Sequence, residues 1–206
     1  MLRGYLHLAA FVASLPAGVA LIRVATDHSA RVAAVVFASA LWALYGVSAT
    51  YHRFTWRPKA RANMRRVDHS MIFVLIAGTY TAVALLLLSP GWRHALLTVV
   101  WTGAAVGIVL KIFVPDATRK VTGAMYIVLG WAAVLAFPQF VERSSLGPLL
   151  LIVAGGLSYT AGAIVFALRR PNPSPTVFGF HEIWHVMVVV GSVCHYLAIR
   201  TLLTSG

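Results

Sequence analysis

The chain has 206 residues, of which 60% are hydrophobic and only 11% are charged. Soluble globular domains carry roughly 25% charged residues, so this composition excludes an ordinary soluble fold and indicates a polytopic membrane protein. Membrane topology and anionic lipid headgroups explain the net charge of +12. The basic segment 53–66 does not predict nucleic-acid binding, because no soluble fold accompanies it.

Seven hydrophobic stretches are each long enough to cross about 30 Å of hydrocarbon as a helix. In chain order they cover residues 4–24, 31–52, 68–88, 93–114, 121–138, 146–168 and 180–203. The first stretch is long for the apolar region of a signal peptide and six more follow it, so we interpret it as a spanning helix. Because the connections are short, the sequence predicts an all-α bundle of seven transmembrane helices in a single domain, residues 1–206.

The basic residues are distributed unevenly between the two sides of such a bundle. Most of the 17 Lys and Arg residues lie near the N-terminus or in the connections after the second, fourth and sixth stretches. The opposite side holds Arg23, Arg31, Arg93, Arg143 and Arg200. Since cytoplasmic loops are enriched in Lys and Arg, we predict a cytoplasmic N-terminus and an outside C-terminus, in a multi-pass protein of the bacterial plasma membrane.

Two histidines, His181 and His185, open the last hydrophobic stretch. Four residues apart on a helix, they lie on one face and about 6 Å apart along the axis. His52 ends the second stretch and Asp68 begins the third, and Ser48 lies one turn before His52. The predicted topology puts all of these residues at one depth, on the cytoplasmic side.

Each of these residues also has an ordinary explanation. A histidine at a helix end can hydrogen-bond lipid headgroups or water, Asp68 can cap a helix N-terminus, and Ser48 can hydrogen-bond its own helix backbone. Ionisable residues in membrane helices are costly, however, and tend to be functional. Their joint occurrence at one depth therefore favours a site.

The residue types in this group are those of a metal site. Three imidazoles without a nearby thiolate fit zinc with three protein ligands and an open position, and iron or nickel also fits. We predict His52, His181 and His185 as the ligands. Zinc lowers the pKa of its water towards about 7, so Asp68 is expected to accept that proton and Ser48 to orient the water or a developing oxyanion.

Short segments that are typical of one family are spread along nearly the whole chain: 48–52 (SATYH), 68–73 (DHSMIF), 76–81 (IAGTYT), 130–131 (GW), 155–160 (GGLSYT) and 181–185 (HEIWH), then Gly191, His195 and Tyr196. In this combination the chain resembles the hemolysin III branch of the progestin and adipoQ receptor proteins, whose wider seven-helix group includes alkaline ceramidases. The resemblance implies a cytoplasm-facing zinc held by the three histidines, which Asp68 touches through water. It also implies a lipid amide or ester substrate in an intramembrane cavity. The glutamate and asparagine near the first helices of receptor-type relatives are not evident, so receptor behaviour is not implied.

The residues and the resemblance together predict a zinc-dependent hydrolase of a membrane lipid. Two alternatives stay open. In one, the metal is structural in a non-enzymatic protein of membrane homeostasis or cytolysis. In the other, Glu182 is the general base of an intramembrane metalloprotease, because the segment 181–185 also matches His-Glu-x-x-His. The sequence specifies neither the lipid nor the oligomeric state.

Three further histidines are candidate neighbours of the site. His69 is turned about 100° from Asp68 on a helix and is expected to face a neighbouring helix or the interface. His195 lies about 21 Å beyond His181, where it lines a cavity or hydrogen-bonds another helix. His7, near the start of the first stretch, is expected to border the site.

Overall fold

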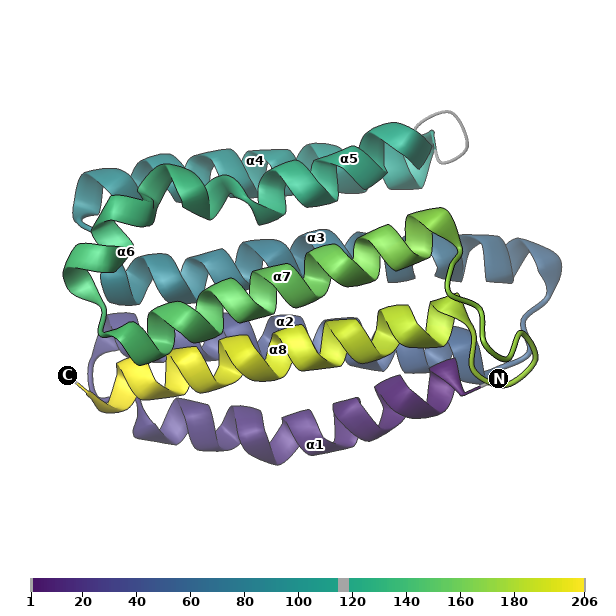
Figure 1. Cartoon of the computed structure of the whole chain (residues 1–206), viewed down its shortest axis with the longest axis horizontal. Coiled ribbons are helices and arrows are strands. Elements are labelled where there is room, and N and C mark those ends of the chain that lie inside the picture. The colour runs from purple at the N-terminus through teal and green to yellow at the C-terminus, as the bar shows by residue number, and fades with distance from the viewer. Residues whose placement is uncertain (1, 115–118, 206) are drawn as a thin grey trace.

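The computed structural model describes every residue except 1, 115–118 and 206. Over the described residues the chain is helical, apart from loops and an isolated bridge between Ser174 and Phe178. The helices are α1 (Arg3–Val24), α2 (His28–Arg53), α3 (Pro58–Leu87), α4 (Pro90–Phe113), α5 (Arg119–Gly130), the 3-10 helix η1 (Ala132–Ala136), α6 (Phe137–Arg143), α7 (Leu146–Leu168) and α8 (Phe180–Thr204). They form 7 spans that are long and apolar enough to cross a membrane, which confirms the predicted all-α fold (Figure 1).

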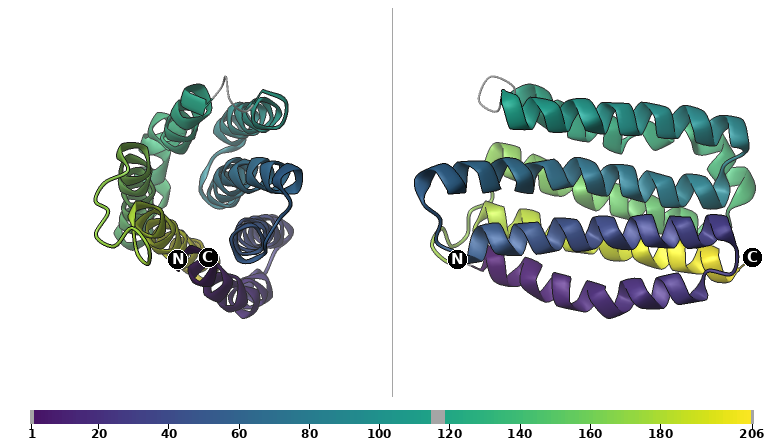
Figure 2. Two further views of the ribbon diagram at one scale, coloured as in Figure 1. Left: turned by 90° about the vertical axis from the view of Figure 1, so that its right-hand side faces the viewer. Right: turned by 180° about the vertical axis from the view of Figure 1, so that it is seen from behind.

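The long helices stand side by side, and their packing follows the chain order (Figure 2). α1 packs on α2, α2 on α3 and α3 on α4, and α8 packs on both α7 and α1. α1 begins at one end of the bundle and α8 ends at the other (Figure 1), as an odd number of crossings requires. The end of α2 and the starts of α3 and α8 therefore lie at the end where α1 begins.

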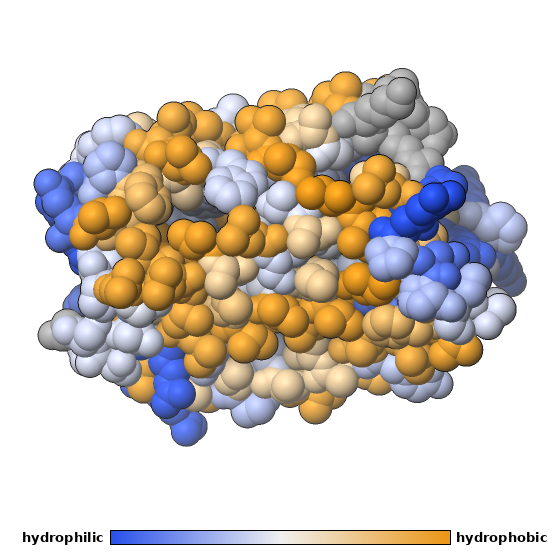
Figure 3. Space-filling model, in the orientation of Figure 1, coloured by the Kyte–Doolittle hydropathy of each residue, from blue (hydrophilic) through white to orange (hydrophobic). Residues whose placement is uncertain are grey.

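Apolar side chains cover the middle of the bundle. Figure 3 shows hydrophobic residues across the centre of one face and hydrophilic residues gathered at its two ends. Val12, Val99 and Leu157 are more than half exposed on their helices, which suits a surface in contact with lipid. The core lies along α2 and α3, the two most buried spans, where Phe37 and Phe73 are fully enclosed.

α3 begins at Pro58, whereas the sequence predicts a start at residue 68. The segment 58–67 is rich in Lys and Arg, and a hydropathy pattern detects only the part of a helix that lipid surrounds. Proline is favourable in the first turn because its missing N–H and its restricted φ suit that position. Asp68 therefore lies within α3, and the interpretation of Asp68 as a helix cap is wrong. The other predicted helix ends agree within a turn, except in the fifth span.

The fifth span is not one continuous α-helix. The sequence predicts a helix over 121–138, but α5 ends at Gly130, η1 follows, and α6 continues to Arg143. The Tyr80 hydroxyl of α3 enters this break: it donates to the Gly130 carbonyl oxygen at 2.8 Å and accepts from the Ala133 N–H at 2.8 Å. Because lipid offers no hydrogen bonds to backbone groups, Tyr80 supplies the partners that the break requires.

The substitution Tyr80→Phe should lower the free energy of unfolding by about 1–3 kcal/mol, because it leaves the backbone of the break unpaired. Denaturant unfolding in detergent micelles, followed by circular dichroism, measures this change. Tyr196→Phe is the matched control, since its hydroxyl makes one bond, to the Ala17 carbonyl oxygen at 3.1 Å, and its removal should cost less. A Tyr80→Phe protein as stable as the wild type would contradict this account of the break.

Candidate metal centre

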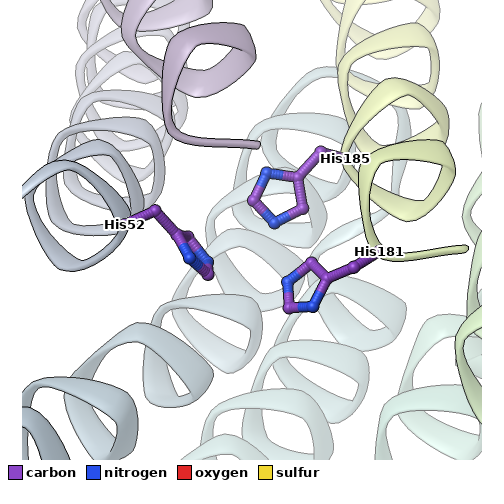
Figure 4. Close-up of side chains that lie close together, drawn as sticks. All are labelled: His52, His181 and His185. Carbon is purple, nitrogen blue, oxygen red and sulfur yellow. The ribbon is translucent and has the colours of Figure 1, made fainter. Parts of the chain in front are cut away.

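Three histidines from two helices meet at one end of the bundle (Figure 4). His52 lies in the last turn of α2, and His181 and His185 lie in the first two turns of α8. One ring nitrogen from each lies within 4.8 Å of the others. The ring centroids of the three pairs are 4.9 to 5.1 Å apart. The structure thus brings together the residues that the sequence nominates as metal ligands.

The spacing and the chemistry of these donors suit a small cation. Zinc binds imidazole nitrogen at about 2.0–2.1 Å, so two nitrogens on one ion are separated by at most about 4.2 Å. Donors within 4.8 Å of one another reach that separation by small rotations of the side chains. Cys194, the single cysteine, lies more than two turns beyond His185 on α8. The donor set is therefore imidazole without thiolate.

A buried carboxylate holds the start of α8. Glu182 is 1% exposed and accepts a hydrogen bond from the Gly179 N–H at 3.0 Å. The Asn172 side-chain oxygen accepts a second bond, from the Phe180 N–H, at 3.2 Å. The first turn of a helix leaves such N–H groups without partners inside the helix. These bonds therefore stabilise the turn that contains His181.

Asp68 and Ser48 form a hydrogen-bonded pair next to the histidine group. Ser48 is buried one turn before His52 on α2, and its hydroxyl bonds the Asp68 carboxylate of α3. Thr50, by contrast, donates to its own helix, at the Gly46 carbonyl oxygen. Among the described residues, Asp68 does not belong to the group of donors that lie within 4.8 Å of one another. Through Ser48 the carboxylate is tied to α2 one turn before His52, outside the group of donors.

Tyr126 ties α5 to α3 at the level of Asp68. Its phenol donates to the His69 backbone carbonyl at 2.8 Å and lies close enough to Asp68 for electrostatic interaction. The Tyr126 ring packs on Phe73, with centroids 4.4 Å apart. Within the described chain, His69 is not part of the group of potential metal donors, in keeping with the predicted turn away from Asp68.

A fourth histidine contacts the group from α1. The His7 ring lies nearly parallel to the His185 ring, with centroids 3.8 Å apart and planes at 21°. Its other aromatic neighbour is Tyr45 of α2, with centroids 5.2 Å apart. The sequence predicts that His7 lies at the depth of the histidine group. Because α1 packs on α8, the His7 ring also contacts the His185 ring. Depth was the signal available in the sequence; the identity of the neighbouring helix was not.

His195 lies away from the group. Its Nε2 is 3.2 Å from the Ile152 carbonyl oxygen of α7. The ring rests against Gly155, where a Cβ atom would come within 2.5 Å of it. His195 is about 15 Å further along α8 than His185. Of the two interpretations drawn from the sequence, the structure shows the hydrogen bond between helices.

Comparison with known proteins assigns the chain to a family. The family described as Haemolysin-III related matches residues 1–196. Hemolysin-3 of Bacillus cereus is 34% identical over 191 residues, which cover 91% of this chain and 84% of that protein. The Hemolysin-3 homolog of Bacillus subtilis (strain 168) is 33% identical over 190 residues, or 90% of this chain and 85% of the relative. Monocyte to macrophage differentiation factor of Homo sapiens is 26% identical over 203 residues, which cover 95% of this chain and 80% of that protein.

The matched region contains the whole histidine group and the Asp68–Ser48 pair. The seven apolar spans and the Bacillus relatives identify a multi-pass integral protein of the bacterial plasma membrane. The chain belongs to the hemolysin III family of the progestin and adipoQ receptor superfamily.

Proposed function

We propose that this protein is a zinc-dependent hydrolase that cleaves an amide or ester bond of a membrane lipid. One observation supports this most strongly: three imidazoles of α2 and α8 converge next to a carboxylate–hydroxyl pair of α3 and α2. His52, His181 and His185 are the proposed ligands. A zinc ion held by three imidazoles supplies a Lewis acid and makes water a nucleophile near neutral pH.

Asp68 is the proposed proton acceptor. A carboxylate that neighbours the donor group, without being part of it, can take a proton from the attacking water instead of serving as a ligand. Ser48 bonds this carboxylate and so restricts its orientation, as outer groups do around metal sites. The pair links α2 to α3 at the level of the histidines, which keeps the base in place relative to His52.

The depth of the group favours a lipid substrate. His52 lies in the last turn of α2 and His181 in the first turn of α8, so the group lies near one edge of the hydrocarbon layer. The amide and ester bonds of membrane lipids lie at this boundary between acyl chains and headgroups. Apolar residues cover the middle of the face drawn in Figure 3, so acyl chains can lie against the bundle next to the histidine group.

Two other functions are compatible with the family and the histidine group. A metalloprotease would use Glu182 as its base, but this carboxylate already accepts the Gly179 N–H at the start of α8. In a non-enzymatic protein of membrane homeostasis or cytolysis the ion would be structural, and the name Hemolysin-3 of the Bacillus cereus relative is the reason to keep cytolysis in view. The Asp68–Ser48 pair favours the hydrolase, because a structural ion requires no neighbouring base.

Zinc content is the first test. We expect about one zinc per chain, because the three histidines form one donor group. His52→Ala and His181→Ala should each reduce the bound zinc to near background, since two imidazoles hold zinc poorly. His94→Ala is the control, because His94 is exposed near the start of α4, at the opposite end of the bundle. Elemental analysis of purified protein gives the ratio, and wild-type protein that retains no metal after zinc loading and buffer exchange would refute the centre.

Lipid hydrolysis is the second test. Asp68→Asn should keep zinc bound but slow hydrolysis by about 10²–10⁴-fold, the usual effect of losing a general base. Ser48→Ala should slow it less, by roughly tenfold, because the base remains but is less well oriented. Purified protein in liposomes of bacterial membrane lipids, followed by mass spectrometry of the products, measures these rates.

Glu182→Gln separates the hydrolase from the metalloprotease. Glutamine retains an oxygen that can accept the Gly179 N–H, so α8 should still form and lipid hydrolysis should continue. Loss of activity in Glu182→Gln, with full activity in Asp68→Asn, would support the protease instead. Zinc-loaded wild-type protein that consumes no lipid would leave a structural ion as the surviving interpretation.

A further inference from the structure

His7 has two ring nitrogens, and neither has a hydrogen-bond partner within the described part of the protein. The side chain is 3% exposed, so bulk water does not reach it. The backbone of His185 approaches the ring without meeting hydrogen-bond geometry. Buried polar atoms in proteins are nearly always paired, and an unpaired one costs free energy. The two nitrogens therefore require a partner other than the described residues.

Packing explains the position of the His7 ring but not its nitrogens. The ring stacks on His185 at 3.8 Å and meets Tyr45 at 5.2 Å. A phenylalanine ring would make the same aromatic contacts without burying polar atoms. The choice of histidine thus indicates a use for the nitrogens themselves.

That use lies at the histidine group. His7 contacts His185 directly and is close enough to His52 for electrostatic interaction. In the described structure His7 is nonetheless outside the group of donors within 4.8 Å of one another. It is therefore placed to bond a molecule that the centre binds, and not to serve as a fourth ligand in this geometry.

His195 is a second buried imidazole of this bundle; one of its ring nitrogens bonds another helix, and its Nδ1 has no partner among the described residues. Its Nε2 pairs with the Ile152 carbonyl oxygen of α7 at 3.2 Å, and Gly155 provides the space for its ring. It links two helices far from the centre. Among the described residues neither His7 nitrogen has a comparable bond to a helix, so a link between helices does not account for this side chain.

We propose that His7 is a substrate-contacting residue of the centre, which donates a hydrogen bond from its ring to an oxygen atom of the bound lipid. An amide or ester carbonyl, or the carboxylate left after hydrolysis, offers such an oxygen. The stack on His185 orients the His7 ring towards the group that holds the reacting bond. This inference rests on the proposed function, because it assigns a role at the same metal centre.

Cobalt-substituted protein and a long-chain alkyl hydroxamate test the proposal. The hydroxamate carries two metal-binding oxygens on a lipid-like chain, and the visible absorption of cobalt(II) reports both metal binding and hydroxamate binding. His7→Phe keeps the ring contacts but removes the nitrogens. We expect unchanged cobalt content and an unchanged spectrum without hydroxamate, but hydroxamate affinity weaker by about tenfold or more, the loss expected for a hydrogen bond to a charged group.

Two further variants define the result. His7→Gln retains an N–H donor and should recover part of the lost affinity, which an effect of ring packing alone would not do. His195→Asn removes the other buried imidazole of the bundle and should bind the hydroxamate as the wild type does. If His7→Phe fails to fold, His7→Leu, which also lacks ring nitrogens, takes its place in the same titration.

Equal hydroxamate affinity in His7→Phe and the wild type would overturn the proposal. Loss of cobalt from folded His7→Phe protein would overturn it as well, since His7 would then support the metal and not the lipid. Wild-type protein that takes up no cobalt would remove the proposed function and this inference together. Cobalt-loaded wild-type protein with an unaffected His7→Phe variant would remove the inference alone.

Discussion

The direction of α2, opposite to that of α3 and α8, is the constraint on which the candidate centre depends. α2 ends, and α3 and α8 begin, at the same end of the bundle (Figure 1), so side chains far apart in the sequence share one depth. One crossing more or fewer between α2 and α8 would separate His52 from His181 by about 30 Å of hydrocarbon. The site can therefore form only because the topology places these side chains at the same depth.

The apolar surroundings explain why polar groups inside the bundle have partners from the chain itself. Tyr80 pairs with the broken backbone of the fifth span, Glu182 with the start of α8, and Ser48 with Asp68. Lipid would leave each of these groups without a hydrogen bond. The Glu182 and Ser48 bonds lie on the helix turns next to the histidines, whereas the Tyr80 bonds stabilise the fifth span. Both ring nitrogens of His7 lack such a partner within the described residues, which is why they are informative.

Hydropathy predicts the seven membrane-spanning segments well. It does not predict where a helix extends beyond the hydrocarbon layer or where a helix is interrupted within it. The segment 58–67 extends α3 beyond the part that lipid surrounds, so its basic residues conceal a helix that the backbone continues to form. The break after Gly130 is equally invisible to hydropathy, because both sides of it are apolar. It depends on the Tyr80 hydroxyl, a group 50 residues away in the chain. Contacts of this kind cannot be inferred from a local pattern.

The sequence alone determined the membrane class, the seven spans and the common depth of His52, His181 and His185, because composition, helix length and the parity of crossings are local or additive properties. The tertiary structure decided which side chains meet. The Ser48–Asp68 bond and the stack of His7 on His185 depend on which helices are neighbours and on how each is rotated about its own axis. Uniformly apolar helices encode neither property, because lipid and protein present them with equally apolar surroundings.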